Sequence, residues 1–325
     1  MEETLNFTCP RLFSEKGSLK IYHISVTYIL VSKIIGVINL AAILPTLVIN
    51  LLLAVTLIKT KSLQTVQNLI ILLIVFLNLG QGIISMPAHG ILLILRSMKR
   101  FSCVADALIC YFGASLAMSS MFAADLLAYD RYDAIRNPFK HEVNFTKAKL
   151  RNTIIVFVIF SLLNSVMFFI APLVHVAISL ASAVMIGTYV FNVIVHILMM
   201  RTVAKLRLRH EEIIPKSLDL SIEEKRERQR KEKRTVRFTL YVIGFLLICY
   251  APSLFKNFFF SLMTTQDYLN MVSDTILLLH ATISPILYIW QAPQIGRAVL
   301  KQCNCLMNSR VEPINTQSID VDGTK

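Results

Sequence analysis

An aspartate and an arginine stand side by side at positions 130 and 131, where a long apolar stretch ends. Charged side chains at the edge of an apolar segment are costly unless they are paired or used. Asp125 lies deeper in the same stretch, and Asp274 lies inside another. The chemistry that these residues favour is charge pairing and ligand binding in apolar surroundings.

Residues for catalysis or metal binding do not gather in one place. The sequence has no Walker A, HExxH or GxSxG motif on a segment expected to face solvent. His89, His196 and His280 are scattered, which disfavours an enzyme. Cys303 and Cys305 form a spaced pair without a second pair or histidines nearby, which argues against zinc. We therefore expect no enzyme, metal site or cofactor.

The elements that carry these residues are long apolar blocks. The chain has 325 residues, of which 55% are hydrophobic, and a span of about 20 apolar residues crosses the bilayer core. The stretches 34–58, 152–174 and 176–200 contain no Asp, Glu, Lys or Arg. Spans are predicted at about 31–58, 66–95, 104–129, 152–174, 176–200, 236–261 and 271–291. The predicted fold class is an all-α membrane protein, a seven-transmembrane helix bundle.

Lys and Arg give the predicted orientation of these spans. The chain has a formal net charge of +13, and most of the basic residues fall in one alternate set of loops. The positive-inside rule makes that set cytoplasmic, so the N-terminus is expected outside and the C-terminus inside. The same distribution argues against nucleic acid as a partner. Asn6, in the sequon Asn6-Phe7-Thr8, is a candidate for glycosylation on the outer side.

The predicted organisation has three parts. Residues 1–30 form an extracellular segment, residues 31–291 form the membrane domain, and residues 292–325 lie in the cytoplasm. The long third inner loop is expected at about 201–235.

A short amphipathic eighth helix is expected after the seventh span. Ile295, Val299 and Cys303 recur every fourth residue, which suits a helix lying on the inner leaflet. Cys303 and Cys305 are then placed for palmitoylation, although inert cysteines would give the same pattern.

Motifs on successive spans together resemble those of the rhodopsin-like (class A) G-protein-coupled receptors, over about residues 34–305. Asp130-Arg131-Tyr132 resembles the DRY motif. The segment 284–288 is similar to NPxxY with Ser284 in place of Asn, and 249–252 is similar to CWxP with Tyr250 in place of Trp. Asn50 matches the polar anchor of the first span, and Asn78 stands where the family usually has Asp.

The resemblance implies a receptor that activates heterotrimeric G proteins through outward movement of the sixth helix. The implied switch residues are Asp130, Arg131, Tyr132, Glu232, Tyr250, Pro252, Pro285 and Tyr288. Glu232 stands at the offset of the family's "ionic lock" acid and would bridge to Arg131. The implied polar anchors are Asn50, Asn78, Ser120 and Ser284. Because Asn78 replaces the acid of the family's sodium site, we expect sodium regulation to be weak or absent.

The resemblance narrows the ligand without naming it. The seventh span has no lysine to hold retinal, and Gly113 stands where amine receptors carry Asp. A peptide, a lipid or another small molecule remains open. Candidate residues of the outer cavity are His89, Asp106, Gly113, Phe255, Asn257, Asp274 and His280.

The second outer loop is expected to be very short, around Val174-His175, and it lacks the family's usual cysteine. In this it is similar to the melanocortin and lysophospholipid receptor branch. Cys9–Cys103 is the remaining candidate for an outer disulfide.

A membrane transporter or channel is the alternative. Such a protein would favour internal repeats and paired charges at mid-depth, and only Asp125 hints at this. The expected location of a receptor is the plasma membrane. Membrane lipids and arrestin are further candidate partners, the latter through phosphorylation of the tail at Ser309, Thr316, Ser318 and Thr324.

Overall fold

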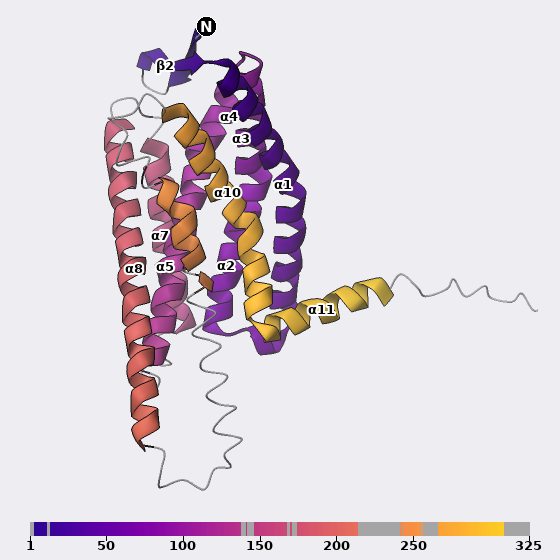
Figure 1. The fold of residues 1–325 in the computed structure, drawn as a ribbon, viewed down its shortest axis with the longest axis vertical. Helices are drawn as coiled ribbons and strands as arrows, with labels where there is room; N and C mark the ends of the chain where they lie inside the picture. Colours follow the sequence, from indigo (N-terminus) through magenta and orange to yellow (C-terminus); the bar gives the residue numbers. More distant parts are fainter. Residues whose placement is uncertain are drawn as a thin grey trace, which may run out of the picture.

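Long helices run side by side along one axis in the computed structural model, with a strand hairpin at one end (Figure 1). The structure describes residues 3–11, 14–137, 141, 146–167, 170, 174–213, 241–242, 244–253, 255 and 266–308. Its elements are β1 (Glu3–Arg11), β2 (Ser14–Ile24), α1 (Val26–Lys59), η1 (Lys61–Leu63), α2 (Val66–Gly80), η2 (Gln81–Ser85), α3 (Met86–Ser97), α4 (Cys103–Leu108), η3 (Ile109–Gly113), α5 (Ala114–Arg136), α7 (Lys147–Met167), α8 (Val174–Ile213), α10 (Gln266–Gln291) and α11 (Pro293–Asn308).

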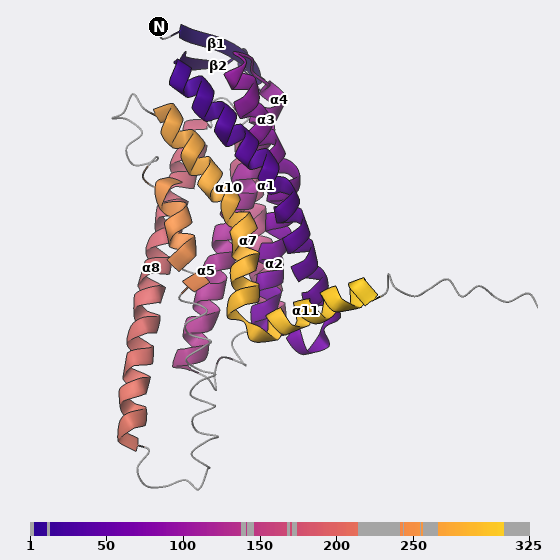
Figure 2. The same ribbon diagram turned by 45° about the vertical axis from the view of Figure 1, so that its right-hand side comes forward.

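The helices supply the predicted spans. Within the described residues, six helical stretches are long and apolar enough to cross a membrane, and two of them join shorter elements into one rod, Val66–Ser97 and Cys103–Arg136. The shorter apolar helix Gly244–Ser253 stands between α8 and α10 (Figure 2). It provides the remaining span, so the predicted seven-helix bundle is confirmed. The amphipathic eighth helix is α11, which leaves the bundle sideways after α10.

The N-terminal segment adds a β-hairpin that the sequence analysis did not foresee. Strands β1 and β2 pair antiparallel, with Glu3 opposite Ile24 and Cys9 opposite Ser18. The hairpin lies at the end of the bundle where α1 begins (Figure 2). We call this the hairpin end, and the opposite end, where α10 passes into α11, the α11 end.

Polarity is reversed relative to a water-soluble bundle. Large apolar side chains face outward, such as Leu44 in α1 and Ile248 in the helix Gly244–Ser253. Buried positions include uncharged polar side chains, such as Asn50 and Asn78. This arrangement suits a hydrocarbon surrounding, where exposed apolar groups cost nothing and polar groups need internal partners.

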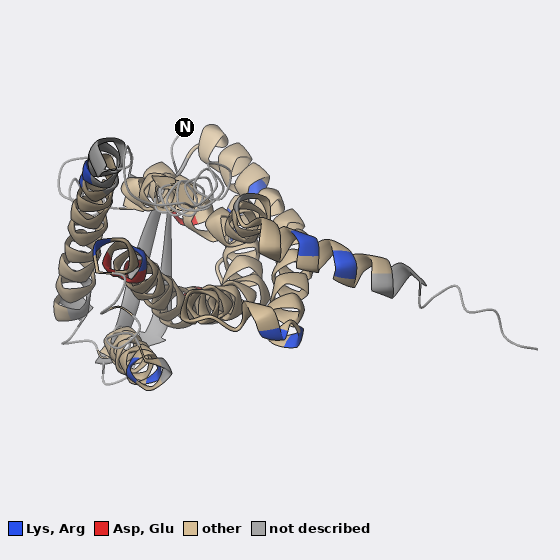
Figure 3. Ribbon diagram, turned by 90° about the horizontal axis from the view of Figure 1, so that it is seen from below, with Lys and Arg blue, Asp and Glu red and all other residues tan. Residues whose placement is uncertain are grey.

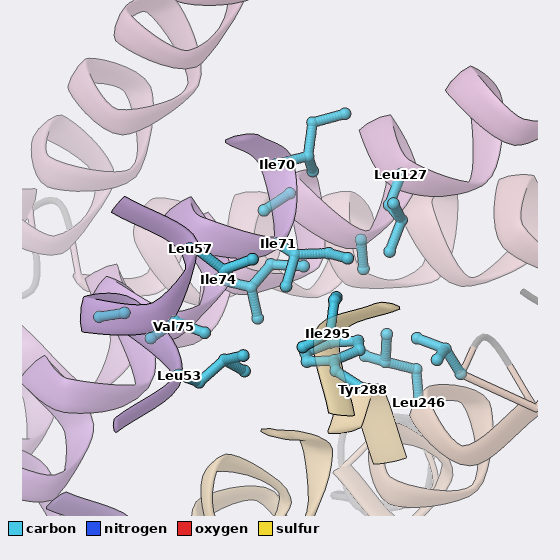
Figure 4. Close-up of a cluster of buried hydrophobic side chains, with 14 of the residues drawn as sticks. Leu53, Leu57, Ile70, Ile71, Ile74, Val75, Leu127, Leu246, Tyr288 and Ile295 are labelled. Atoms are coloured by element: carbon cyan, nitrogen blue, oxygen red, sulfur yellow. The ribbon is translucent and has the colours of Figure 1, made fainter. Parts of the chain in front are cut away.

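The main apolar cluster lies in the half of the bundle toward the α11 end (Figure 4). It joins Leu53 of α1, Ile74 of α2, Leu127 of α5 and Tyr288 of α10, all nearly inaccessible to solvent. Ile295 of α11 reaches the same cluster, so the amphipathic helix is anchored to the bundle by its apolar side.

The boundary between the fourth and fifth spans differs from the prediction. The fourth span was expected to reach residue 174, but α7 ends at Met167 and α8 begins at Val174. Pro172 provides the physical reason, because proline lacks an N–H and disfavours helical backbone in the residue before it. Beyond the expected fifth span, α8 continues through strong helix formers to Ile213.

Gly36 of α1 and Gly90 of α3 let the two helices pack closely against each other. A Cβ added at Gly90 would lie 2.8 Å from Leu40 and 3.1 Å from the carbonyl oxygen of Gly36. Small residues of this kind let membrane helices approach each other closely.

We expect Gly90→Ala to destabilise the protein by about 1–3 kcal/mol, because the added methyl overpacks the contact. Gly187→Ala is the matched control, since nothing lies within 4 Å of a Cβ there and helix propensity favours alanine. Thermal unfolding of the purified protein measures both variants. Equal unfolding temperatures for the two would contradict the assigned contact.

Candidate functional site

Asp130 is the centre of a charge cluster near the α11 end of α5. Its carboxylate is fully buried and accepts a hydrogen bond from Arg131 Nε at 2.8 Å, with a second bond from Arg131 Nη2. The other carboxylate oxygen lies 3.0 Å from His141 Nε2. A buried carboxylate needs such partners, because an unpaired charge there would be strongly destabilising. The arginine is therefore held along the side of its own helix.

Tyr132 and Arg136 continue the cluster toward the end of α5. Arg136 donates to the Tyr132 hydroxyl at 2.7 Å, and its guanidinium lies 5.7 Å from the ring centroid. Tyr132 also packs against a small apolar cluster that contains Val195 and Met199 of α8. The charged end of α5 is thus tied to α8.

A buried polar network joins α1, α2 and α10. Asn78 Nδ2 donates to Asn50 Oδ1 at 3.2 Å and to Ser284 Oγ at 3.0 Å. Asn50 Nδ2 donates to the carbonyl of Ala281 at 2.9 Å. Pro285 explains this last bond: it has no N–H, so the carbonyl four residues before it lacks the usual helical donor. The anchor residues of the first, second and seventh spans therefore satisfy one another.

Tyr250 stands at the middle of the bundle, between the helix Gly244–Ser253 and α10. Its ring meets His280 edge to face at 6.0 Å, and its hydroxyl donates to the carbonyl of Ala117 at 3.5 Å. His280 is stacked on Phe245, and neither ring nitrogen has a hydrogen-bond partner within the described part of the chain. Ser120 lies beside the Tyr250 hydroxyl. Within the described residues, aromatic ring contacts and not hydrogen bonds position this histidine.

The candidate cavity residues are only partly brought together. His89 of α3 meets Thr275 of α10 at 3.5 Å, and Thr275 accepts a hydrogen bond from Asn39 of α1 at 3.0 Å. Gly113 faces Ser85, so two π-helical turns, η2 and η3, meet at this level. Such turns are frequent at functional sites.

Other cavity candidates lie apart from this contact. Asp106 lies in the rod Cys103–Arg136, and its Oδ1 is 3.9 Å from Nη2 of Arg96 in α3. Asp274 is half-buried in α10, and Phe255 is 68% exposed. Asn257 and Glu232 lie outside the described residues.

The proposed covalent sites are located as follows. Cys103, at the start of α4, is disulfide-bonded. Cys303 in α11 is a free, half-buried thiol. The side chains of Asn6, Cys9 and Cys305 lie outside what the structure describes.

The sequence did not predict the hydrogen-bond partners of two acidic residues. Asn192 of α8 donates to the carboxylate of Asp125, and His141 meets Asp130. The sequence marks both acids as charges within or at the end of an apolar segment. The partner of Asp125 depends on helix packing, and the partner of Asp130 depends on the path of a loop. The only sequence signal was the presence of a polar residue, Asn192, within the uncharged run 176–200.

Long apolar helices around buried polar contacts, with an ion-paired arginine near one end, define a seven-helix membrane protein. A sequence model of the rhodopsin family of seven-transmembrane receptors matches residues 49–288, which reach from the start of the Asn50 network to Tyr288. No curated protein sequence matches the chain significantly. The chain belongs to the rhodopsin family of seven-transmembrane receptors. It is thus a signalling receptor, of a family that responds to extracellular ligands and acts through G proteins, and not of an enzyme class.

Membership makes the sodium prediction testable. Neutral amides and hydroxyls surround Asn78, so we expect the thermal stability of the wild type to be the same in sodium and in choline chloride. Asn78→Asp restores a carboxylate and should gain about 1.4 kcal/mol at ten times the sodium dissociation constant. Thermal unfolding in both salts measures this. A sodium-dependent wild type would refute the prediction.

Proposed function

We propose that this receptor lies in the plasma membrane with the hairpin end outside and activates G proteins at the α11 end. The disulfide at Cys103 supports this orientation, because disulfides persist in oxidising compartments and not in the cytosol. Lys and Arg at the helix ends in Figure 3, which looks from the α11 end, agree with a cytoplasmic face there.

The Asp130–Arg131 pair is the observation that carries the proposed mechanism. The described arrangement is the resting one, in which the arginine is neutralised by its neighbour and Asp130 also binds His141. Activation releases the arginine and moves the cytoplasmic part of the sixth helix outward, which opens a cleft for the G protein. A ligand drives this change only by binding the open state more tightly than the resting state.

The pivot of that movement is the contact between Tyr250 and His280. It lies between the polar contact of His89 with Thr275 and the Asn78 network, and the helix of Tyr250 contains Pro252. A ligand that contacts α3 and α10 near Thr275 would press on His280 and thereby on Tyr250. We infer that the ligand cavity includes His89, Gly113 and Asp274. A peptide, lipid or other small molecule fits this proposal. Retinal does not, because the seventh span has no lysine to hold it.

The Cys103 disulfide is proposed to join Cys9. Cys110, Cys249 and Cys303 are not disulfide-bonded, so Cys9 and Cys305 are the remaining cysteines. Cys305 belongs to α11, at the opposite end of the bundle from α4 (Figure 1). Cys9 belongs to β1, at the same end. We further propose glycosylation at Asn6 and palmitoylation at Cys303 and Cys305 on the two opposite sides.

The test of the proposed function needs no ligand. We expect Asp130→Asn to raise basal G-protein activation several-fold, because an amide holds Arg131 much less strongly than a carboxylate does. Glu232→Ala should act in the same direction if Glu232 forms the second restraint on Arg131. Dissociation sensors for each G-protein family, in cells matched for surface display, give the readout and name the transducer.

A transporter or channel would behave differently. Neither variant would change any G-protein signal at normal surface display. That result would refute the proposed switch.

A further inference from the structure

A cavity of about 350 Å³ lies between α5, α7 and α8, apart from the Tyr250 pivot. Asp125 and Tyr129 of α5 line it together with Lys149 and Phe157 of α7 and Phe191 of α8. Its volume falls near the lower end of the range for small-molecule sites, about 300–1,000 Å³. None of the receptor functions described above uses it.

The polar end of this cavity is a carboxylate without a cation. Asp125 accepts a hydrogen bond from Asn192, whose amide also donates to the carbonyl of Thr188 at 3.1 Å. No Lys, Arg or His of the described chain lies within ion-pair distance of Asp125, although Lys149 lines the same cavity. A carboxylate among apolar side chains favours a charged donor as its partner.

Three aromatic side chains line the cavity beside Leu126 and Leu150. The rings of Tyr129, Phe157 and Phe191 line the cavity, and Phe157 is fixed by stacking on Phe122 at 4.5 Å. Aromatic faces attract ammonium groups, most strongly where water is excluded. A carboxylate next to several rings is therefore suited to an alkylammonium.

The cavity opens toward the surface that faces lipid. Phe191 is partly exposed, and neighbouring side chains on the same helices, Val156 and Ile194, are exposed and apolar. A ligand that arrives through the bilayer must carry an apolar body. Lys149 is exposed at the start of α7, so it would repel a second positive charge on the ligand.

We propose that this cavity binds a lipophilic monoamine, with its ammonium on Asp125 and its apolar chain between Phe157 and Phe191. This site is separate from the ligand cavity proposed above, where Gly113 offers no carboxylate to an amine. It borders the α5 helix six residues before Arg131, about 9 Å along the axis. A bound amine would thus strengthen the packing of α5 between α7 and α8.

Binding of radiolabelled decylamine to the whole receptor in phosphatidylcholine nanodiscs tests the proposal. We expect saturable binding above that of empty nanodiscs, displaced by unlabelled decylamine and not by decan-1-ol, which has the same chain without the charge. Asp125→Asn should weaken binding about tenfold or more, since it removes a charged hydrogen bond. Asp133→Asn, which neutralises another acid of α5 that bonds to Asn137 outside this cavity, is the matched control and should bind as the wild type does.

Thr153→Phe fills the same cavity from α7 and gives a second, charge-independent test. It should also abolish the saturable binding. Thermal unfolding without decylamine establishes that each variant is folded. If Asp125→Asn does not fold, the preference of the wild type for amine over alcohol and the loss of binding in Thr153→Phe decide the matter.

Several outcomes would overturn the proposal. These are no saturable binding to the wild type, equal displacement by decan-1-ol, equal binding to folded Asp125→Asn, and undiminished binding to Thr153→Phe. The assay contains no G protein, so its failure is distinguishable from failure of the proposed signalling switch.

Discussion

Arg131→Ala is expected to reduce G-protein activation to the level of cells without the receptor. In the resting arrangement the guanidinium is bound twice by Asp130 and is mostly buried. In the mechanism that we propose, it is the cation that the opened cytoplasmic cleft presents to the G protein once the helices separate. Alanine removes that group, and no neighbouring arginine can replace it, because Arg136 is bound to Tyr132 one turn further on.

The measurement compares basal activation in the Asp130→Asn background. That variant supplies a raised signal without any ligand, and adding Arg131→Ala should lower the signal at least about tenfold, the effect of losing one charged hydrogen bond. Arg136→Ala in the same background is the matched control, since it removes an exposed arginine from the same end of α5. Surface display is measured in parallel.

Two results would contradict this role of Arg131. One is full activity of the double variant at normal surface display. The other is an equal loss with Arg136→Ala, which would assign the effect to the general charge of the helix end.

The contacts that the sequence predicts best are those that the chemistry of a single residue requires. A charged pair at the end of an apolar segment must be satisfied, and Asp130 and Arg131 satisfy each other. The missing N–H of Pro285 requires a donor for the Ala281 carbonyl, but only the packing of α1 against α10 shows that Asn50 supplies it. The need for a partner can thus be read from sequence, whereas the partner's identity requires the relative placement of two helices.

Asp125 is a second residue whose need for a partner is visible in the sequence, while the identity of that partner is not. Its partner Asn192 lies 67 positions away on α8, and only the packing of α5 against α8 brings the two side chains together. The N-terminal hairpin was not predicted, for a different reason. Leu5, Phe7 and Cys9 alternate with other residues, as in a strand, but the segment is short and polar at its start, which is also typical of an irregular extension. That alternation is the signal in the sequence that indicates β1.

Cys103→Ser is expected to lower the stability of the receptor by about 2–5 kcal/mol and to reduce its surface display. The disulfide restrains the unfolded chain, and the loop that it closes is long if the partner is Cys9. Cys110→Ser is the control, because Cys110 is a half-buried thiol of the neighbouring turn η3 and is not disulfide-bonded. Thermal unfolding of the purified variants and antibody staining of intact cells measure the two effects.

The double variant distinguishes the proposed partner from a mere neighbour. If Cys9 and Cys103 form one bond, Cys9→Ser should cost as much as Cys103→Ser, and the double variant should cost no more than either single variant, because the bond can be lost only once. Additive losses would mean that the two cysteines act independently. An unchanged Cys9→Ser variant would remove Cys9 as the partner, and with it the covalent link that we propose holds the hairpin against the outer end of α4.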